Sequence, residues 1–373
     1  MGLSKHTIGE FVELFSARCG IPNLSPEQVS GINIEKEFFE PARQVGEDTS
    51  NYKIVPPDYF ACNLMHVGRD GVLPIALNHT AQNKYVSPAY SVFRIDESQI
   101  LKEYFFILVK SSEKDRYFWF HTDASIRQGL SWEDFCDIDI TLPSIEQQRK
   151  YVNIYLSLQK NLEAYESKIE DLKIVCDGYI ENLRKTYSIT KLRDYIEQCD
   201  ERNTDDNYTL ESLRGISIQK TFIDSKADMA DVSLTPYLIV YPQSFAFVPV
   251  TSRNGEKITL ALNDTEESYI VSSSYTVFRV NDAQKLLPEY LFIFLNRSEF
   301  DRYARFNSWG SAREVFTMDD MKDVAIPIPD ISVQQEIVNI HKCYIERQRI
   351  ATQLREQLKM LCPILIKGAQ TDN

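Results

Sequence analysis

The chain has 373 residues, of which 43% are hydrophobic and 25% charged, a composition typical of a globular protein and not of a disordered or fibrous one. Its formal net charge of −13 is unfavourable for a protein that would hold nucleic acid by charge alone. No run approaches the roughly 18 to 20 apolar residues of a membrane span, and the N-terminal stretch lacks a signal peptide's apolar core. We therefore expect a cytoplasmic protein without a membrane partner.

The cysteines and histidines give no sign of a metal site. Seven cysteines occur singly, without a C-x-x-C pair, and five histidines are dispersed along the chain. Scattered cysteines in an odd number are typical of reduced thiols and not of a disulfide framework. The sequence therefore predicts neither disulfides nor bound metal.

A strand-like phrase occurs twice, as AYSVFRID at residues 89–96 and as SYTVFRVN at 274–281. At an offset of 185, residues 52–95 and 237–280 are identical at 16 of 44 positions, and only single-residue insertions separate the flanking similarities. This period is far longer than that of solenoid repeats, so each copy should have its own core. The chain contains a duplicated domain.

Each copy presents the same order of elements. Short strands and turns come first, as in YKIVPPDYFAC and YLIVYPQSFAF, and a helical stretch follows, as in EYFFILVKSSEKDRYF and PEYLFIFLNRSEFDRYA. A Ser/Thr-x-x-Asp signal at Ser131 and at Thr317 predicts the N-cap of a further helix. Each copy closes on a strand that leads into proline, IDITLP and VAIPIP.

After each proline an apolar heptad pattern predicts a long helix. A helix of about 40 residues would reach roughly 60 Å. The pattern predicts a first helix with an unbroken heptad seam and a shorter second helix in which Arg347 interrupts one seam position. Two such helices, each following an equivalent domain, are expected to pack together and to hold the domains at a fixed separation. The expected interface residues are Tyr155, Leu158, Leu162, Tyr165, Ile169, Leu172, Leu354, Leu358 and Leu361.

Catalytic motifs are not found in the sequence. There is no G-x-x-x-x-G-K-[ST] loop, no G-x-S-x-G elbow and no G-x-G-x-x-G fingerprint. VPPDYF at residues 55–60 departs from the catalytic loop of amino-methyltransferases, because Val55 replaces the required polar residue. A methyltransferase with an unrecognised cofactor site stays open as an alternative, which binding of S-adenosylmethionine by the chain alone would favour.

Two α/β domains alternate with two long helices, and each helix opens with a proline and a Gln-Gln pair, in LPSIEQQRK and IPIPDISVQQEI. This arrangement resembles the specificity subunit of type I restriction–modification systems. The resemblance implies an α/β (α+β) fold with two similar target-recognition domains separated by two long α-helices that form an antiparallel coiled coil. The expected ranges are 1–143 and 188–329 for the recognition domains, and 144–187 and 330–373 for the spacer helices.

The resemblance also implies a function. In that family each recognition domain reads one half of a bipartite site in double-stranded DNA, and the helices set the gap and dock methyltransferase (M) subunits, and through them restriction (R) subunits. The subunit itself is not an enzyme, and S-adenosylmethionine, ATP and Mg are expected only on the partner subunits. The leading alternative is a duplicated protein–protein scaffold, which sequence-dependent DNA binding by the reconstituted complex would exclude.

The charge distribution stands against DNA binding by the chain alone. Residues 1–142 carry 13 basic and 20 acidic side chains, and residues 188–329 carry 15 and 22, which leaves each range at −7. Net charge governs long-range attraction, whereas base reading depends on a few local contacts. We therefore expect weak binding by the chain alone and much of the phosphate contact from its partners.

Four arginines are candidates for base contacts. Arg69 in GRDG and Arg253 in SRNG precede Asp-Gly and Asn-Gly, which are hairpin-turn signals, and arginine can contact guanine through two hydrogen bonds. An ordinary solvated hairpin explains this pattern equally well. Arg127 in SIR and Arg313 in SAR lie in a polar stretch after the helical region. We favour them over the other candidates and favour base contacts there over structural ion pairs.

Two further pairs repeat in both copies. Asn78 and Asn263, in ALNHT and ALNDT, follow a strand and could pair with adenine, although a role in a turn is favoured. Lys36 and Lys220 are also equivalent, and a lone lysine at a surface usually serves solubility. All eight residues are predicted DNA contacts.

Overall fold

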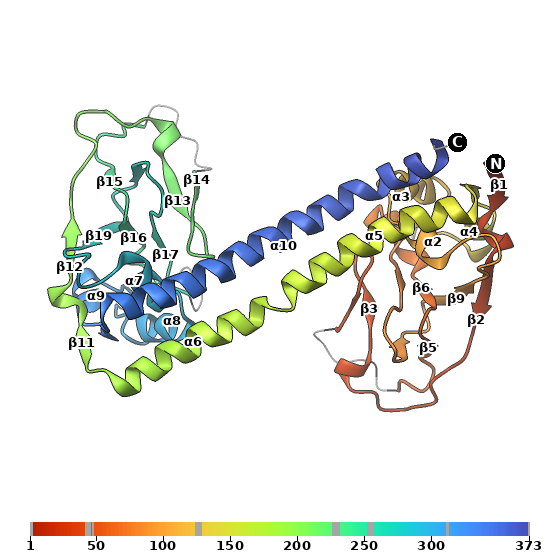
Figure 1. Ribbon diagram of the computed structural model, residues 1–373, viewed down its shortest axis with the longest axis horizontal. Coiled ribbons are helices and arrows are strands. Elements are labelled where there is room, and N and C mark those ends of the chain that lie inside the picture. Colours follow the sequence, from red (N-terminus) through yellow and green to blue (C-terminus); the bar gives the residue numbers. More distant parts are fainter. Residues whose placement is uncertain are drawn as a thin grey trace. The chain divides into compact units, whose positions relative to one another are not determined.

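In the computed structural model, residues 3–41, 46, 48–123, 129–225, 232–251, 257–310 and 313–371 are described. The chain forms two compact units (Figure 1). Unit 1 comprises residues 1–164 and 350–373, and unit 2 comprises residues 165–349. Within the described ranges, no helix combines the length and the apolar character that crossing a membrane requires.

Unit 1 is organised around a four-stranded antiparallel sheet in the order β2-β9-β6-β7. Its strands are β2 (Val12–Phe15), β9 (Ser91–Ile95), β6 (Phe60–Cys62) and β7 (Ile75–Leu77). Three two-stranded antiparallel sheets accompany it: β1 (Ser4–Thr7) with β10 (Asp139–Leu142), β3 (Gly31–Ile32) with β4 (Phe38–Phe39), and β5 (Lys53–Val55) with β8 (Lys84–Val86).

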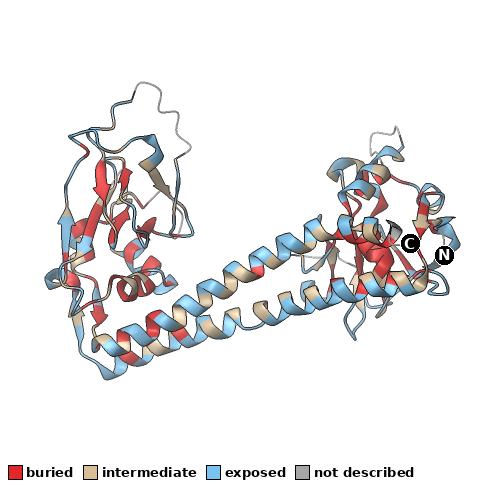
Figure 2. Ribbon diagram, turned by 45° about the horizontal axis from the view of Figure 1, so that its top comes forward, coloured by how far each residue is buried: buried red, intermediate tan, exposed pale blue. Residues whose placement is uncertain are grey.

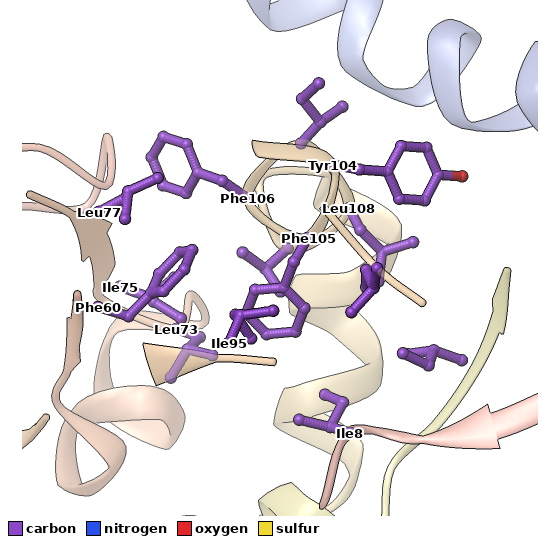
Figure 3. Close-up of a cluster of buried hydrophobic side chains, with 14 of the residues drawn as sticks. Ile8, Phe60, Leu73, Ile75, Leu77, Ile95, Tyr104, Phe105, Phe106 and Leu108 are labelled. Atoms are coloured by element: carbon purple, nitrogen blue, oxygen red, sulfur yellow. The ribbon is translucent and has the colours of Figure 1, made fainter. Parts of the chain in front are cut away.

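Helix α2 (Lys102–Val109) forms the centre of the unit 1 core. Its apolar run from Tyr104 to Val109 is buried all round, as expected for a helix enclosed by other elements. Phe105 meets Phe60 edge to face, with 5.3 Å between the ring centres (Figure 3). Phe60 also stacks on Phe93 at 5.2 Å. The remaining short helices are α1 (Val67–Asp70), α3 (Ser112–Phe120) and α4 (Trp132–Cys136).

Unit 2 repeats this topology with the sheet order β12-β19-β16-β17, which confirms the predicted duplication. Phe245 stacks on Phe278 at 4.7 Å, the counterpart of the pair in unit 1. The strands and short helices are β11 (Ile189–Lys191), β12 (Ile196–Cys199), β13 (Arg214–Ile216), β14 (Phe222–Asp224), β15 (Leu238–Val240), β16 (Ser244–Phe247), β17 (Leu260–Leu262), β18 (Tyr269–Val271), β19 (Thr276–Val280), β20 (Ala325–Pro327), α7 (Pro288–Leu295), α8 (Ser298–Phe306) and α9 (Met318–Lys322).

The two predicted N-caps are present. The hydroxyl of Ser131 accepts a hydrogen bond from the Asp134 amide at 2.9 Å, and the hydroxyl of Thr317 accepts one from the Asp320 amide at 3.2 Å. Each satisfies an amide that the first turn of the helix leaves without a partner. They fix the starts of α4 and α9, the last short helices before each long one.

The long helices depart from the prediction in two ways. The first helical stretch is not one unbroken helix, because α5 (Ile145–Glu166) and α6 (Ile169–Thr186) are separated by a turn at residues 167–168. The second is not shorter: α10 (Ile331–Thr371) runs for 41 residues and accommodates Pro363. The predicted α/β (α+β) class, with two similar domains and two long helical stretches, is confirmed.

A buried glutamine fastens each long helix to the domain before it. The Gln148 amide group donates to the carbonyls of Gln99 and Pro143 at 2.9 Å, and its oxygen accepts from the Leu101 amide at 2.9 Å. Gln334 makes the same three bonds, to Lys285, Pro329 and Leu287. Both glutamines are fully buried and use both donor positions and the acceptor, so the start of the helix is held at one position.

Within each unit, segments of the two helical stretches run antiparallel. In unit 1, Val152 and Tyr155 of α5 pack with Cys362 and Leu365 of α10. In unit 2, Ile180 and Leu183 of α6 share a core with Ile337 and Val338. The nine predicted interface residues are all buried or half-buried. Figure 2 shows exposed positions alternating with less exposed ones along the long helices.

Arg347, which interrupts the predicted seam, has a place in this packing. Its guanidinium lies over the ring of Tyr165, 5.3 Å from the ring centre. An arginine can occupy this position in an apolar seam because the face of an aromatic ring attracts a cation. The seam therefore continues through Arg347.

Candidate nucleic-acid interface

Arg313 is exposed in a tight turn that follows α8. The turn is closed by two antiparallel hydrogen bonds between the backbones of Trp309 and Val315, at 3.2 and 3.0 Å. A Cβ on Gly310, whose φ is +144°, would collide with the carbonyl oxygen of Arg313, so the turn depends on glycine. This geometry holds the backbone of Arg313 at the domain surface.

The turn is fastened to the core on its C-terminal side. The Phe316 amide donates to the Pro249 carbonyl at 2.8 Å, and the Thr251 amide donates to the Glu314 carbonyl at 3.0 Å. The Phe316 side chain is fully buried, and Arg305 of α8 forms an ion pair with Glu314. Arg313 therefore extends from a supported turn, which is the arrangement that a base-reading side chain needs.

Arg69 lies on a short helix, and the hairpin predicted around it is wrong. Residues Val67–Asp70 form α1, and Gly71 ends the helix in the left-handed conformation at φ +64°. The Asp-Gly signal thus marks a helix C-terminus, where glycine is equally favoured. The exposed guanidinium binds the Asp70 carboxylate at 2.7 and 3.0 Å, and this ion pair raises the pKa of Arg69 and lowers that of Asp70. A base contact by Arg69 would compete with this ion pair.

Arg127 and Arg253 lie outside the described residues. Arg127 corresponds to Arg313 in the sequence repeat, whereas the offset of 185 pairs Arg69 with Asn254, the residue after Arg253. Their DNA contacts stay predictions.

Asn78 and Asn263 are fully buried and hold the turn that follows β7 and β17. The amide of Asn78 donates to the carbonyls of Val55 and Gln82, both at 2.9 Å, and its oxygen accepts from the amide and the hydroxyl of Thr80. Asn263 makes the corresponding four bonds, with Val240, Glu267 and Thr265. A side chain with these bonds has no donor left for adenine.

Lys36 and Lys220 are buried as well, at 4% and 3% exposure. The ammonium of Lys36 donates to Asp115 at 2.6 Å and to the carbonyl of Val109 at the end of α2. That of Lys220 lies 2.8 Å from Asp301 and 2.8 Å from the carbonyl of Leu295 at the end of α7. Burial lowers the pKa of both lysines. This placement argues against phosphate contacts by either ammonium.

Part of the acidity of each domain is neutralised by such fixed pairs. Across neighbouring strands Arg94 binds Glu13 and Arg279 binds Glu197, each at 2.6 Å. Among the described residues, no group of histidine, cysteine or acidic side chains could hold a metal ion.

Sequence reasoning missed the exposed aromatic side chains at the ends of α3 and α8. Phe120 and Phe306, with Trp309, are the most exposed large hydrophobic residues of the described chain, at 76%, 80% and 71%. The only sequence signal is the recurrence of phenylalanine at equivalent positions in SEKDRYFWF and SEFDRYARF. The sequence alone does not distinguish an exposed phenylalanine from one in the hydrophobic core.

Two sequence comparisons identify the relatives of this arrangement. Residues 246–360 match the family model of the type I restriction modification DNA specificity domain. Over 118 residues the chain is 27% identical to the type I restriction enzyme HindI specificity subunit of Haemophilus influenzae. That match covers 31% of this chain and 26% of the relative, so it spans about a quarter of the relative's length. The resemblance predicted from the sequence is confirmed.

The fold is similar to a solved one. The crystal structure of a type-I restriction-modification system S subunit from M. genitalium aligns with a TM-score of 0.61 and 12% identity. The alignment covers 99% of this chain and 96% of that chain. The likeness therefore extends over both units.

Proposed function

Because residues 246–360 belong to the type I restriction modification DNA specificity domain family, we propose that this chain is the DNA-recognition subunit of such a system. In this proposal the chain is not catalytic. Each domain reads one half of a bipartite site in double-stranded DNA, and the helices dock methyltransferase subunits and, through them, restriction subunits. The partner subunits, and not this chain, bind S-adenosylmethionine, ATP and Mg. The complex works in the cytoplasm.

The match to the specificity domain carries the proposal, and the repeated fold supports it. Two domains with the same sheet order suit a target of two halves, because each domain can present the same kind of surface to its half. The supported turn of Arg313 offers a guanidinium to base edges, and guanine is the base that arginine reads best.

The acidity of the chain favours one competing function, a protein–protein scaffold without DNA specificity. A range with a net charge of −7 repels phosphate at long distance. In the proposed complex the partners supply most of the phosphate contacts, and the chain supplies the local ones.

Genome-wide mapping of methylated adenines tests the proposal. The chain is co-expressed with its partner methyltransferase, and the methylated positions are compared with those of cells that hold the methyltransferase alone. The proposal requires one bipartite sequence, methylated only when the chain is present. Methylation without a common sequence, in a complex that assembles normally, would favour the scaffold.

A further inference from the structure

The last turns of α3 and α8 expose aromatic rings on a face that also carries arginine. In unit 1 this surface consists of Arg116, Trp119 and Phe120, and in unit 2 of Arg302, Phe306 and Trp309. We call these surfaces the aromatic tips. Residues three and four apart lie on one side of a helix, so the arginine and the phenylalanine of each tip share a face.

The opposite side of each helix fixes the direction of its tip. Phe118 of α3 and Ala304 of α8 occupy equivalent positions and are both fully buried. Asp115 and Asp301 face inward as well, where each binds a buried lysine. The outward direction of Phe120 and Phe306 is therefore set by the packing of the helix.

Charge separates the tips from the rest of their domains. The inward aspartate of each helix is neutralised by its lysine, which leaves Glu113 against Lys114 and Arg116 in α3. In α8, where Arg305 pairs with Glu314, it leaves Glu299 against Arg302. Helix α3 therefore carries an excess of positive charge in a domain of −7, and at α8 the excess comes from the exposed Arg313 of the following turn. Each tip is thus complementary to an anionic partner.

The second tip continues into the turn of Arg313. Trp309, at 71% exposure, opens that turn and pairs with Val315 through two backbone hydrogen bonds. Arginine in a supported turn that an exposed tryptophan opens can provide both polar and apolar contacts to a base pair. A protein partner would also accept the rings, but the excess of positive charge favours DNA.

We propose that the aromatic tips contact DNA bases, with Phe120 touching the half-site of the first domain and Phe306 that of the second. The inference rests on the proposed function and adds an apolar contact to it. The rings press against base surfaces in the groove, either on thymine methyl groups or between neighbouring base pairs. They contribute to specificity, because a thymine methyl group and an easily unstacked base step each occur only in certain sequences.

Binding measurements with the reconstituted complex test the tips. The wild-type site is first defined by methylation mapping, and fluorescence anisotropy then compares a duplex that holds the site with a scrambled one. Phe306→Ala should weaken binding of the cognate duplex by about 5- to 150-fold, leave the scrambled duplex unaffected and keep the salt dependence unchanged. Phe120→Ala should do the same, and methylation mapping should show relaxed reading of the first half only.

A control and a stability measurement complete the design. Leu210, at 54% exposure in unit 2, lies away from the tip in sequence, and Leu210→Ala should bind both duplexes as the wild type does. The thermal midpoint of Phe306→Ala should equal that of the wild type, because the ring packs on little.

The outcomes are distinct. Unchanged cognate binding by Phe306→Ala, in a complex whose wild type is specific, overturns the inference and leaves the proposed function standing. Loss of methyltransferase binding before DNA is added overturns it in favour of a protein contact. Equal weakening on both duplexes overturns the base contact. A wild-type complex without sequence preference overturns the proposed function, and the inference with it.

Discussion

Lys36 and Asp115 form a buried ion pair, with 2.6 Å between the ammonium nitrogen and a carboxylate oxygen. The pair joins the turn between β3 and β4 to the start of α3, and Asp115 also accepts the Leu73 amide at 3.1 Å. Unit 2 repeats the pair as Lys220 and Asp301. In both copies the ion pair has a structural role, because it anchors the helix, α3 or α8, that ends in the aromatic tip.

Removing the lysine alone should destabilise the protein strongly. Lys36→Met leaves the Asp115 carboxylate buried without its cation, which costs about 3–5 kcal/mol of unfolding free energy. Urea denaturation followed by circular dichroism measures the loss. Lys173→Met, on an exposed position of α6, is the matched control and should change stability by no more than about 0.5 kcal/mol.

The double variant Lys36→Met/Asp115→Asn sharpens this test. It removes the negative charge of Asp115, which Lys36→Met alone leaves buried without a cation. The double variant should therefore recover part of the lost stability. A double variant as unstable as the single one, or more so, would show that the charge of Asp115 is not what makes Lys36→Met costly.

Removing the side chain of Gln334, which fastens α10, should destabilise the protein far more than removing that of its neighbour Gln335. Gln334→Ala deprives the Leu287 amide and the carbonyls of Lys285 and Pro329 of their partner, and each buried group left without one costs about 1–3 kcal/mol. Gln335→Ala is the matched control, since Gln335 is exposed and bonds only to Asn339 among the described residues. Thermal unfolding of both variants measures the difference. Equal midpoints would contradict the role of Gln334.

Local signals in the sequence predicted much of this fold. The offset between the two copies predicted the equivalent sheets, and the caps at Ser131 and Thr317 depend only on residues three positions away. Periodicity likewise predicted the half-buried seam of Leu158 and Leu162. These features follow from neighbours in the chain, so one sequence is sufficient to find them.

The features that sequence reasoning missed depend on distant partners. Lys36 finds its carboxylate 79 positions away, so nothing near it in the chain marks it as buried. The Asp-Gly signal at Arg69 is typical of a hairpin turn and of a helix end, and only the backbone conformation of Gly71 distinguishes the two. Phe120 and Phe306 are exposed although their neighbours Phe118 and Ala304 are buried, a distinction set by helix direction.

Acid should weaken unit 2 through His341. Burial lowers the pKa of this histidine below 6.5, so the unfolded chain takes up a proton at a higher pH than the folded one. The free energy of unfolding should therefore fall as pH drops from about 6.5 to the lowered pKa. His341→Gln should flatten this fall in part, because burial also lowers the pKa of His66 and His79. Urea titrations at several pH values measure it, and an unchanged slope would refute the contribution of His341.

If the paired helices set the gap of the site, lengthening both should lengthen it. One heptad adds about 10 Å of helix, which corresponds to about three base pairs of DNA. Seven residues inserted into α6 and seven into the part of α10 that packs on it should change the unmethylated gap and preserve both half-sequences. An insertion into α10 alone is the control and should disrupt assembly, because it shifts the seam on one side only. The same gap in an assembled double insertion would exclude the ruler.

Arg313→Ala tests the predicted base reader most directly. The side chain is exposed, so its removal should leave the thermal midpoint unchanged. If the guanidinium makes two hydrogen bonds to guanine, the variant should lose about 1 to 3 kcal/mol of binding, confined to one base position of the second half-site. If it contacts phosphate, binding should weaken on all sequences, and the slope of log K against log salt should fall by about one unit. Methylation mapping and anisotropy at several salt concentrations distinguish these results. Arg302→Ala is the matched arginine on the neighbouring helix, and a specificity change in it but not in Arg313→Ala would move the reading residue from the turn to α8.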